Sequence, residues 1–255
     1  MGRTISRYGW VRDLPDFRDH KFSDVLGVQS LSDLPSLVDL RNEMPPVYDQ
    51  GSLGSCTANA IGAAVQYDLR KLNLPDFMPS RLFIYFNERE MEGTIKVDSG
   101  AMIRDGMKSL SVQGVCHETI MPYVIERFTR RPTKRAYTDG LRHNKVQYMS
   151  VEQSESGLKS ALASGFPVVF GFAVYNSFEG KEVAASGIVE MPKPNETCIG
   201  GHAVLIVGYD DSTRRFIVRN SWGESWGMRG YFTMPYDYVL NSNLADDFWV
   251  LKSIN

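Results

Sequence analysis

The fold is decided by the segment from Gln50 to Leu72, which reads QGSLGSCTANAIGAAVQYDLRKL. After Cys56 its apolar residues recur at steps of three and four positions, which places them on one face of a helix. Glycines and serines precede this stretch as a loop and cap, and Pro75 lies beyond its end. We therefore predict a helix over 56–72 that begins at a cysteine and buries one apolar stripe. The stripe consists of Ala58, Ile61, Val65, Leu69 and Leu72.

The rest of the chain changes in character from helices to strands. Hydrophobic periodicity predicts helices over 80–89, 102–112 and 156–164, and strands over 168–174, 203–209, 216–219, 231–234 and 248–252. Because the helices come first and the strands later, the order is typical of an α+β protein with segregated halves. A basic, proline-containing segment over 127–135 is predicted to be a solvated linker between them.

Length and composition exclude several classes of protein. The 255 residues suffice for one large domain or two modest ones, and 43% hydrophobic with 23% charged residues is ordinary for a globular chain. The formal net charge of −2 argues against nucleic acid or an anionic membrane as the main partner. No apolar run approaches the roughly 20 residues of a membrane-spanning helix. Three cysteines are too few for a disulfide framework and leave at least one thiol free.

Residues 1–37, called the arm below, are polar and rich in turn-forming residues. Their apolar positions Trp10, Phe17, Phe22 and Leu26 are predicted to anchor the arm on a domain. No apolar core of a signal peptide follows the first ten residues. We therefore expect a protein that is cytoplasmic or exported by a leaderless route.

Cys56 is the first candidate for chemistry, because it stands at the first turn of the predicted helix. The unsatisfied amides and the dipole at a helix start favour an anion, so the thiol pKa is expected to fall. A thiolate there is a nucleophile that lacks only a base. The alternative is a small buried apolar residue, which is the usual role of a free cysteine.

His202 and Asn220 are predicted to meet across a hairpin. A turn centred between Asp211 and Ser212 would place His202 opposite Ser221, with Asn220 one position away, and a longer turn would shift this register by about a residue. An asparagine carbonyl can accept the imidazole N–H and aim the other ring nitrogen at a thiol. Separately, the two residues have ordinary alternatives as a packed strand histidine and a turn asparagine.

Gln50 precedes Cys56 by six residues, across a glycine-rich loop. Its amide can donate to a developing oxyanion, with the Cys56 backbone N–H as the second donor. The alternative is a surface loop glutamine. The other polar candidates are interpreted as structural: His20, His117 and His143 as surface or packing residues, and Cys116 and Cys198 as structural or spare thiols.

Three blocks of sequence together resemble the papain family of cysteine peptidases. They are QGSLGSC at 50–56, GHAV at 201–204, and NSWGESWG at 220–227 followed by Gly230 and Tyr231. His202 follows Cys56 by 146 residues, within the roughly 130–150 of papain-like enzymes. VDLR at 38–41 and MPY at 121–123 extend the resemblance over most of the chain after the arm.

The resemblance implies a two-lobed α+β fold. A peptidase domain over 38–255 would have a helical lobe mainly in 50–130 and an antiparallel, β-barrel-like lobe mainly in 135–255, with an active-site cleft between them. The arm would be a short propeptide-like segment, as in bacterial or viral relatives.

The resemblance also assigns roles to residues. Cys56 matches the nucleophile, His202 the general base and acid, Asn220 the residue that orients the imidazole, and Gln50 the oxyanion donor. Trp222 matches an indole that covers the His–Asn hydrogen bond.

Substrate binding is expected at five positions: Ser99, Gly100, Gly201, Ala203 and Trp222. Ser99 and Gly100 stand where the family has a Gly-Gly pair that aligns the substrate backbone. The chain departs from the family at Leu53, in place of a disulfide cysteine, and at Thr57, in place of a tryptophan.

The function that follows is that of a cysteine endopeptidase, a hydrolase that cleaves peptide bonds through an acyl-enzyme on Cys56. We expect a protein or peptide substrate, a monomer, no partner nucleic acid, and no cofactor or metal. Two alternatives are an acyl or peptidyl transferase on the same fold, and a catalytically silent peptide-binding relative.

The arm has two possible roles. In the first it partly covers the cleft and damps activity until it is moved or cut. In the second it packs on the back of the domain and only stabilises the fold.

Overall fold

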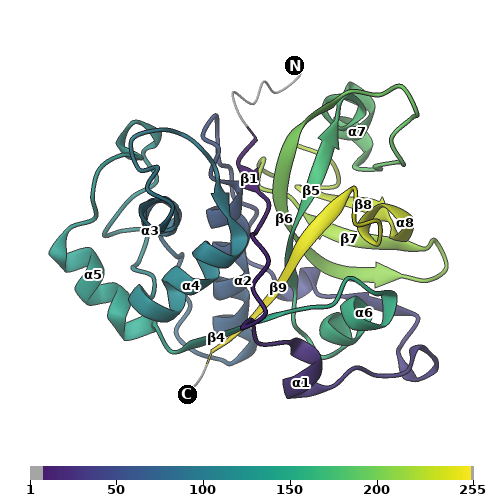
Figure 1. Cartoon of the computed structure of the whole chain (residues 1–255), viewed down its shortest axis with the longest axis horizontal. Coiled ribbons are helices and arrows are strands. Elements are labelled where there is room, and N and C mark those ends of the chain that lie inside the picture. The colour runs from purple at the N-terminus through teal and green to yellow at the C-terminus, as the bar shows by residue number, and fades with distance from the viewer. Residues whose placement is uncertain (1–7, 254–255) are drawn as a thin grey trace.

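The computed structural model describes residues 8–253, in which helices gather on one side and a sheet on the other (Figure 1). The helical side contains α2 (Cys56–Lys71), α3 (Arg81–Met91), α4 (Ile103–Gln113) and α5 (Lys134–Gly140). The shorter helices α1 (Phe22–Leu26), α6 (Glu155–Ala163), α7 (Lys181–Ser186) and α8 (Tyr236–Val239) lie around the sheet. The predicted α+β class is confirmed.

The sheet is antiparallel and has seven strands, in the order β4-β9-β5-β6-β7-β8, with β2 paired to β6. Its strands are β2 (Leu37–Asp39), β4 (Val146–Ser150), β5 (Val168–Tyr175), β6 (Cys198–Asp210), β7 (Arg215–Arg219), β8 (Tyr231–Pro235) and β9 (Ala245–Ser253). Within residues 8–253 the ends of this sheet, β4 and β8, do not pair. The expected β-barrel-like lobe is therefore an open sheet.

Helix α2 is buried nearly all round, rather than along one stripe, because it lies between two layers. Helices α3 and α4 pack on one side of it, and β6 and β9 contact the other. Its small residues allow this close approach: Ala58, Ala60, Ala63 and Ala64 are all buried. The helix thus joins the two halves of the molecule and fixes Cys56 at their junction.

Side-chain caps start three of the other helices, at Ser80 for α3, Thr133 for α5 and Ser154 for α6. The basic segment over 127–135, predicted as a solvated linker, is mostly exposed, although Pro132 is buried and the last two residues already belong to α5. None of the helices in residues 8–253 is long and apolar enough to cross a membrane.

The hairpin of β6 and β7 forms as predicted, but with the longer turn, so its register differs from that of the short turn. Asp210 pairs with Arg215 and encloses a four-residue turn, in which Arg214 has a positive φ of 53°. The pairing next to the turn is therefore two positions from the predicted one. A bulge between Ile206 and Gly208 removes one of these two positions. The bulge thus reduces the shift from two positions to one before the hairpin reaches His202.

The part of the arm that precedes α1 within the described residues, 8–20, runs without a helix along the junction of the two halves (Figure 1). Its two-residue strand β1 (Trp10–Val11) pairs in parallel with β3 (Ala101–Met102). Farther along, Phe22 is 1% exposed and packs in the core of the sheet side. The predicted anchors Phe17 and Leu26 are wrong: Phe17 is 99% exposed and Leu26 also faces solvent.

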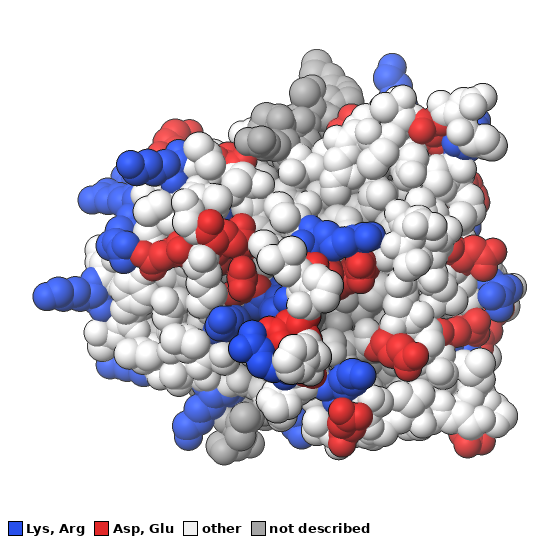
Figure 2. All heavy atoms as spheres, in the orientation of Figure 1, with Lys and Arg blue, Asp and Glu red and all other residues white. Residues whose placement is uncertain are grey.

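Charged side chains of both signs mingle on the face along which the arm runs (Figure 2). Two of the ion pairs there join the arm to the body. Arg12 pairs with Asp246 at 3.2 Å, and Asp19 pairs with Arg104 at 2.7 Å. The Arg12–Asp246 pair is about half exposed and contributes little free energy, whereas the side chains of the Asp19–Arg104 pair are largely buried.

Candidate active site

Cys56 is the first residue of α2 and faces β6. Its Sγ accepts a hydrogen bond from the backbone N–H of Ala203 at 3.3 Å, and the residue is fully buried. His202 immediately precedes Ala203 in the chain. The helix start and the strand therefore bring the predicted nucleophile and the predicted base to one place.

His202 and Asn220 are hydrogen-bonded, through Nε2 and Oδ1 at 2.8 Å. Because the amide oxygen can only accept, Nε2 carries the proton, which leaves Nδ1 as the basic nitrogen of the neutral ring. Asn220 Oδ1 also accepts the backbone N–H of Ser221 at 2.8 Å, which fixes the orientation of the amide. Both residues are buried.

Trp222 stacks on the imidazole of His202, with ring centroids 5.1 Å apart and planes at 30°. Phe178 and Trp226 pack against the indole in turn, at 5.3 and 5.2 Å. This aromatic cluster shields the His–Asn hydrogen bond from water, which strengthens it electrostatically.

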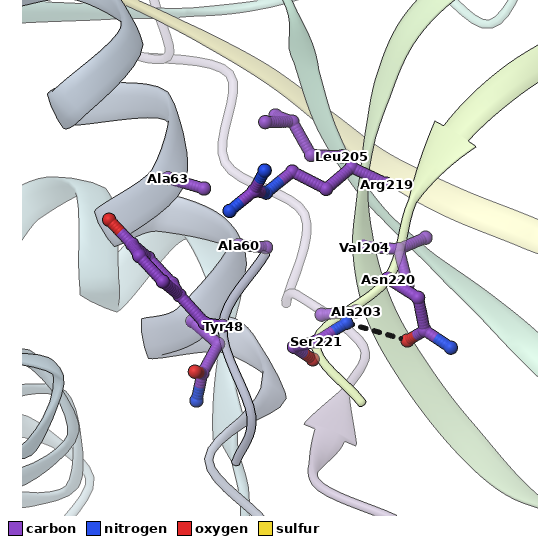
Figure 3. Close-up of a pocket in the computed structure, with 10 residues that line it drawn as sticks. Tyr48, Ala60, Ala63, Ala203, Val204, Leu205, Arg219, Asn220 and Ser221 are labelled. Atoms are coloured by element: carbon purple, nitrogen blue, oxygen red, sulfur yellow. Dashed lines mark hydrogen bonds between the residues drawn. The ribbon is translucent and has the colours of Figure 1, made fainter. Parts of the chain in front are cut away.

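Figure 3 shows the inner side of this junction, where Asn220 and Ser221 lie close to Ala203 of β6 and opposite α2. The cavity there has a volume of about 10 Å³. It has room for no more than about one water molecule, so it is not a substrate pocket. Arg219 is buried beside it and donates to the carbonyl oxygens of Pro45 and Pro46 at 2.6 and 2.5 Å.

Gln50 lies at the same junction and is buried. Its Oε1 accepts from the hydroxyl of Ser221 at 2.6 Å, and its Nε2 donates to the carbonyl of Leu53 at 2.9 Å. These contacts tie the loop before Cys56 to the segment after Asn220. A primary amide has two N–H donors, so one remains for an oxyanion beside the loop.

The arm lies directly on this site, through residues 8–13, called the cover segment below. The predicted substrate-binding residue Gly100 has a φ of +72°, and a Cβ there would lie 2.2 Å from the carbonyl oxygen of Gly9. The neighbouring Ala101 donates its backbone N–H to that same oxygen at 2.8 Å. Ser99, by contrast, donates its hydroxyl to Thr94 at 2.8 Å.

Glycines on both sides of the junction let the cover segment come so close. A Cβ at Gly171 or Gly201 would meet the indole of Trp10 at 2.0 or 2.6 Å. A Cβ on Gly9 itself would lie 1.8 Å from the carbonyl oxygen of Gly54. The five glycines that contact the cover segment, called the glycine bed below, are Gly54, Gly100, Gly171, Gly200 and Gly201.

The pKa of Cys56 is raised by burial, to about 12. The backbone amides of Ala203 and Gly9 lower it only in part, and the buried carboxyl of Glu88 raises it further. The position at the helix start predicted a lowered thiol pKa, and this prediction is wrong for the closed arrangement. Burial under the cover segment therefore favours the neutral thiol over the thiolate.

Two buried carboxyl groups hold the cover segment on the body, and sequence reasoning missed both. Asp247 Oδ2 accepts from the indole N–H of Trp10 and from the backbone N–H of Asp13, each at 2.8 Å. Asp13 accepts from the indole N–H of Trp249 at 2.8 Å. Burial, together with the charge of Asp247, raises the pKa of Asp13 to about 7, and burial raises that of Asp247 to about 6.

Glu88 is a further residue that the sequence analysis did not single out. Its Oε1 accepts from the hydroxyl of Thr57 at 2.6 Å, and burial raises its pKa well above the usual value. The sequence signal that could have pointed to Glu88 is its partner Thr57, which stands where the family has a tryptophan. Cys116 is buried and Cys198 exposed, and both are free thiols.

Comparisons with known proteins agree with this geometry. A model of the family described as papain family cysteine protease matches residues 34–248. A peptidase C1-like protein of Acanthamoeba polyphaga mimivirus is 41% identical over 98% of this chain and 88% of its own length. A cathepsin B-like protein, CP3, of Giardia intestinalis is 30% identical over 81% of this chain and 71% of its own.

The same likeness extends to solved structures. Xylellain, a cysteine protease from Xylella fastidiosa, superposes with a TM-score of 0.91 at 45% identity, over 99% of this chain and 98% of that one. A digestive procathepsin L2 of Tenebrio molitor, at 21% identity, shares the fold with a TM-score of 0.71 over 98% of this chain and 77% of its own.

Proposed function

Because the chain belongs to the papain family of cysteine proteases and is a papain-like cysteine peptidase, we propose that it cleaves peptide bonds within protein chains through Cys56. The observation that carries the proposal is the ordered pair of His202 and Asn220 beside the buried thiol. The hydrogen bond of Nε2 to Asn220 leaves Nδ1 as the nitrogen that can exchange a proton with the thiol.

The reaction would proceed by acyl transfer. His202 takes the thiol proton, and the Cys56 sulfur attacks the peptide carbonyl to form a carbon–sulfur bond. The backbone N–H of Cys56 and the amide of Gln50 stabilise the oxyanion. His202 then gives its proton to the leaving amine as the peptide bond breaks. Water, deprotonated by His202, releases the acid and restores the thiol.

Two alternatives use the same residues differently. A transferase would accept an amine in place of water, and product analysis with added amines distinguishes it. A silent peptide-binding protein has no need of an oriented imidazole, a buried thiol and a glutamine at one junction. The complete set of Gln50, Cys56, His202 and Asn220 therefore favours the peptidase.

We further propose that the cover segment keeps the full chain in a closed, weakly active form. Gly9 pairs with Ala101 where Gly100 is expected to align a substrate backbone, so an extended substrate and the cover segment compete for one edge. The raised pKa of Cys56 in the closed form adds to this effect, because the thiolate is the nucleophile. The two roles expected for the arm then belong to different parts of it. Residues 8–13 cover the site, and Phe22 stabilises the fold.

An active-site label tests the proposal. We expect an epoxysuccinyl peptide to give one adduct on the full chain, located on Cys56 by mass spectrometry of its peptides. Cys198 is a matched control, because its thiol is exposed and free but has no placed base. An adduct on Cys198 instead, or labelling that persists in Cys56→Ala, would overturn the assignment. The monomeric state and the location in the cell remain predictions from the sequence.

A further inference from the structure

His117, Asp139 and His143 form a compact cluster away from the active site. One ligand atom of each residue lies within 4.8 Å of those of the other two. Asp139 belongs to α5, which lies at the outer edge of the helical side in Figure 1. His143 follows directly after α5, whereas His117 lies in the loop after α4. The cluster therefore joins two separate segments of the chain.

The side chains of this cluster are held in place by a hydrogen bond within the cluster and by packing against an aromatic ring. Asp139 Oδ2 accepts from the backbone N–H of His117 at 3.0 Å and from its Nδ1 at 2.7 Å. Phe77 packs over both imidazoles, with centroids 4.1 Å from His117 and 4.6 Å from His143. Ordered rings with converging nitrogen atoms lose less conformational entropy on binding a ligand.

We propose that His117, Asp139 and His143 form a binding site for a divalent transition-metal ion of the zinc class. Two imidazoles and one carboxylate are a donor set typical of zinc, with ligand distances of about 2.0–2.2 Å. The ion would replace the proton between His117 Nδ1 and Asp139 Oδ2, and the imidazole proton would move to Nε2. Ligands of a tetrahedral zinc ion lie about 3.3 Å apart, so these two atoms need to separate by roughly half an ångström.

The surroundings offer an access route and two arginines whose positive charge opposes a cation. Asp139 lines a surface hollow of about 260 Å³ together with Ile120, Arg135, Thr138 and Arg142. Arg142 Nη1 lies 3.9 Å from Asp139 Oδ1, and its side chain is 72% exposed, so it can turn away into solvent. Its charge weakens the attraction for a cation. Removing that charge should therefore tighten binding.

The fourth ligand position would remain open to water. An ion held in this way would link α5 to the loop that contains His117. We therefore expect it to brace the helical side against local unfolding, apart from the catalytic residues. Any ion that binds the folded state better than the unfolded state raises the melting temperature.

Isothermal titration with Zn²⁺ alone tests the site on the full chain. The parent variant carries Cys56→Ala and Cys198→Ser, so that neither thiol competes for the metal. We expect one ion per chain and a rise in Tm of a few degrees. His143→Ala and Asp139→Asn should each weaken binding by at least about tenfold. Arg142→Gln should strengthen it severalfold.

His20→Ala is the matched control, because His20 is exposed and lies outside the cluster. Its Zn²⁺ affinity should equal that of the parent. Where His143→Ala does not fold, His143→Gln takes its place and the same loss is expected. The absence of binding at millimolar Zn²⁺, or an affinity unchanged by both cluster variants, would overturn the proposal. So would a Co²⁺ spectrum with a thiolate charge-transfer band, because it would place the ion on Cys116.

Discussion

Cys56 and His202 lie on long elements of the two cores, whereas the cover segment above them has only a two-residue strand. Helix α2 is packed on both sides, and β6 has neighbours along its length. The cover segment is held by backbone contacts with the glycine bed and by hydrogen bonds from Trp10 and Asp13 to Asp247. The difference teaches that the two cores fix the catalytic residues, whereas the cover segment belongs to neither core, and we expect it to leave without unfolding the fold.

Cys56→Ala should have the largest effect. Peptidase activity should fall by on the order of 10⁴-fold or more, because removal of the nucleophile disables the whole catalytic unit. Cys56→Ser should be nearly as inactive, since a serine alkoxide is much harder to form here. Both are measured as kcat/KM on a small peptide. Melting curves should show an intact fold, since the first turn of a helix tolerates alanine. Hydrolysis at the wild-type rate by either variant would refute the assignment.

Asn220→Ala should have the second largest effect on turnover. Loss of the acceptor for His202 Nε2 frees the imidazole to rotate, and a misplacement of this kind costs up to about a hundredfold in kcat. KM should change little, because the residue orients the base and is not expected to bind substrate. Asn220→Asp keeps an acceptor and should recover part of the rate. If kcat were unaffected by Asn220→Ala, the orienting role would be wrong.

Gly9→Val should raise activity, because its side chain cannot fit against Gly54. We expect an increase of roughly tenfold in kcat/KM on a small peptide, since the displaced cover segment no longer competes with substrate. Trp10→Ala should act in the same direction. Phe17→Ala is the control, because this exposed arm residue makes no buried contact. Equal rates for Gly9→Val and Phe17→Ala would mean that the cover segment does not limit access.

Phe22→Ala separates the second role of the arm from the first. It removes a buried side chain from the core, and loss of a buried phenylalanine typically lowers the free energy of unfolding by roughly 3–5 kcal/mol. The free energy of unfolding should fall accordingly in a denaturant titration, while kcat/KM at low temperature changes little. A large rise in activity without loss of stability would contradict the division of the arm into two parts.

The smallest effect is a pH dependence of the cover. The pKa values of Asp13 and Asp247 are raised in the closed form, so protonation favours closure. This contribution is complete below the ordinary carboxyl pKa of about 4 and is lost as the pH rises through 6 to 7. Arg104 and Arg12, which face the pair, oppose this shift, and Asp246 reinforces it.

Asp247→Asn should remove the contribution of Asp247 to that pH dependence while it keeps an oxygen acceptor for Trp10. Compared with the wild type, its activity should be a few-fold lower at pH 8 and the same at pH 5. Asp247 has a positive φ of 59°, which asparagine tolerates well. Asp16→Asn on the exposed part of the arm is the control. If the activity ratio of Asp247→Asn to wild type is the same at both pH values, Asp13 and Asp247 do not control closure of the cover segment.

Local patterns in the sequence predicted the parts of the site that depend on neighbours along the chain. The period of three and four residues predicted α2 within one residue at its end, and the strand pattern brought His202 to Asn220. The exact register stayed open because the length of the turn and the bulge have no clear signal in sequence. The bulge partly cancels the shift from the longer turn, so the side-chain contact survives.

Local sequence patterns could not predict the contacts of the cover segment, because these contacts join residues far apart in the chain. The glycine bed spans Gly54 to Gly201, and no periodicity connects its members. The pKa of Cys56 depends on this burial, so an argument from the helix start alone gave the opposite direction. Phe17 shows the converse error, since an apolar residue in an arm need not have a partner.

The exposed stretch around Phe17, between the cover segment and the buried Phe22, has a consequence for how the cover works as an inhibitor. A tethered segment competes with substrate at an effective concentration of about millimolar that does not change when the protein is diluted. A single cut in this stretch would turn the cover into a separate short peptide, present only at the concentration of the protein itself. Dilution would then release it, while Phe22 kept the remaining arm on the core. Activation by such a cut would be irreversible, whereas opening by pH would be reversible within one molecule.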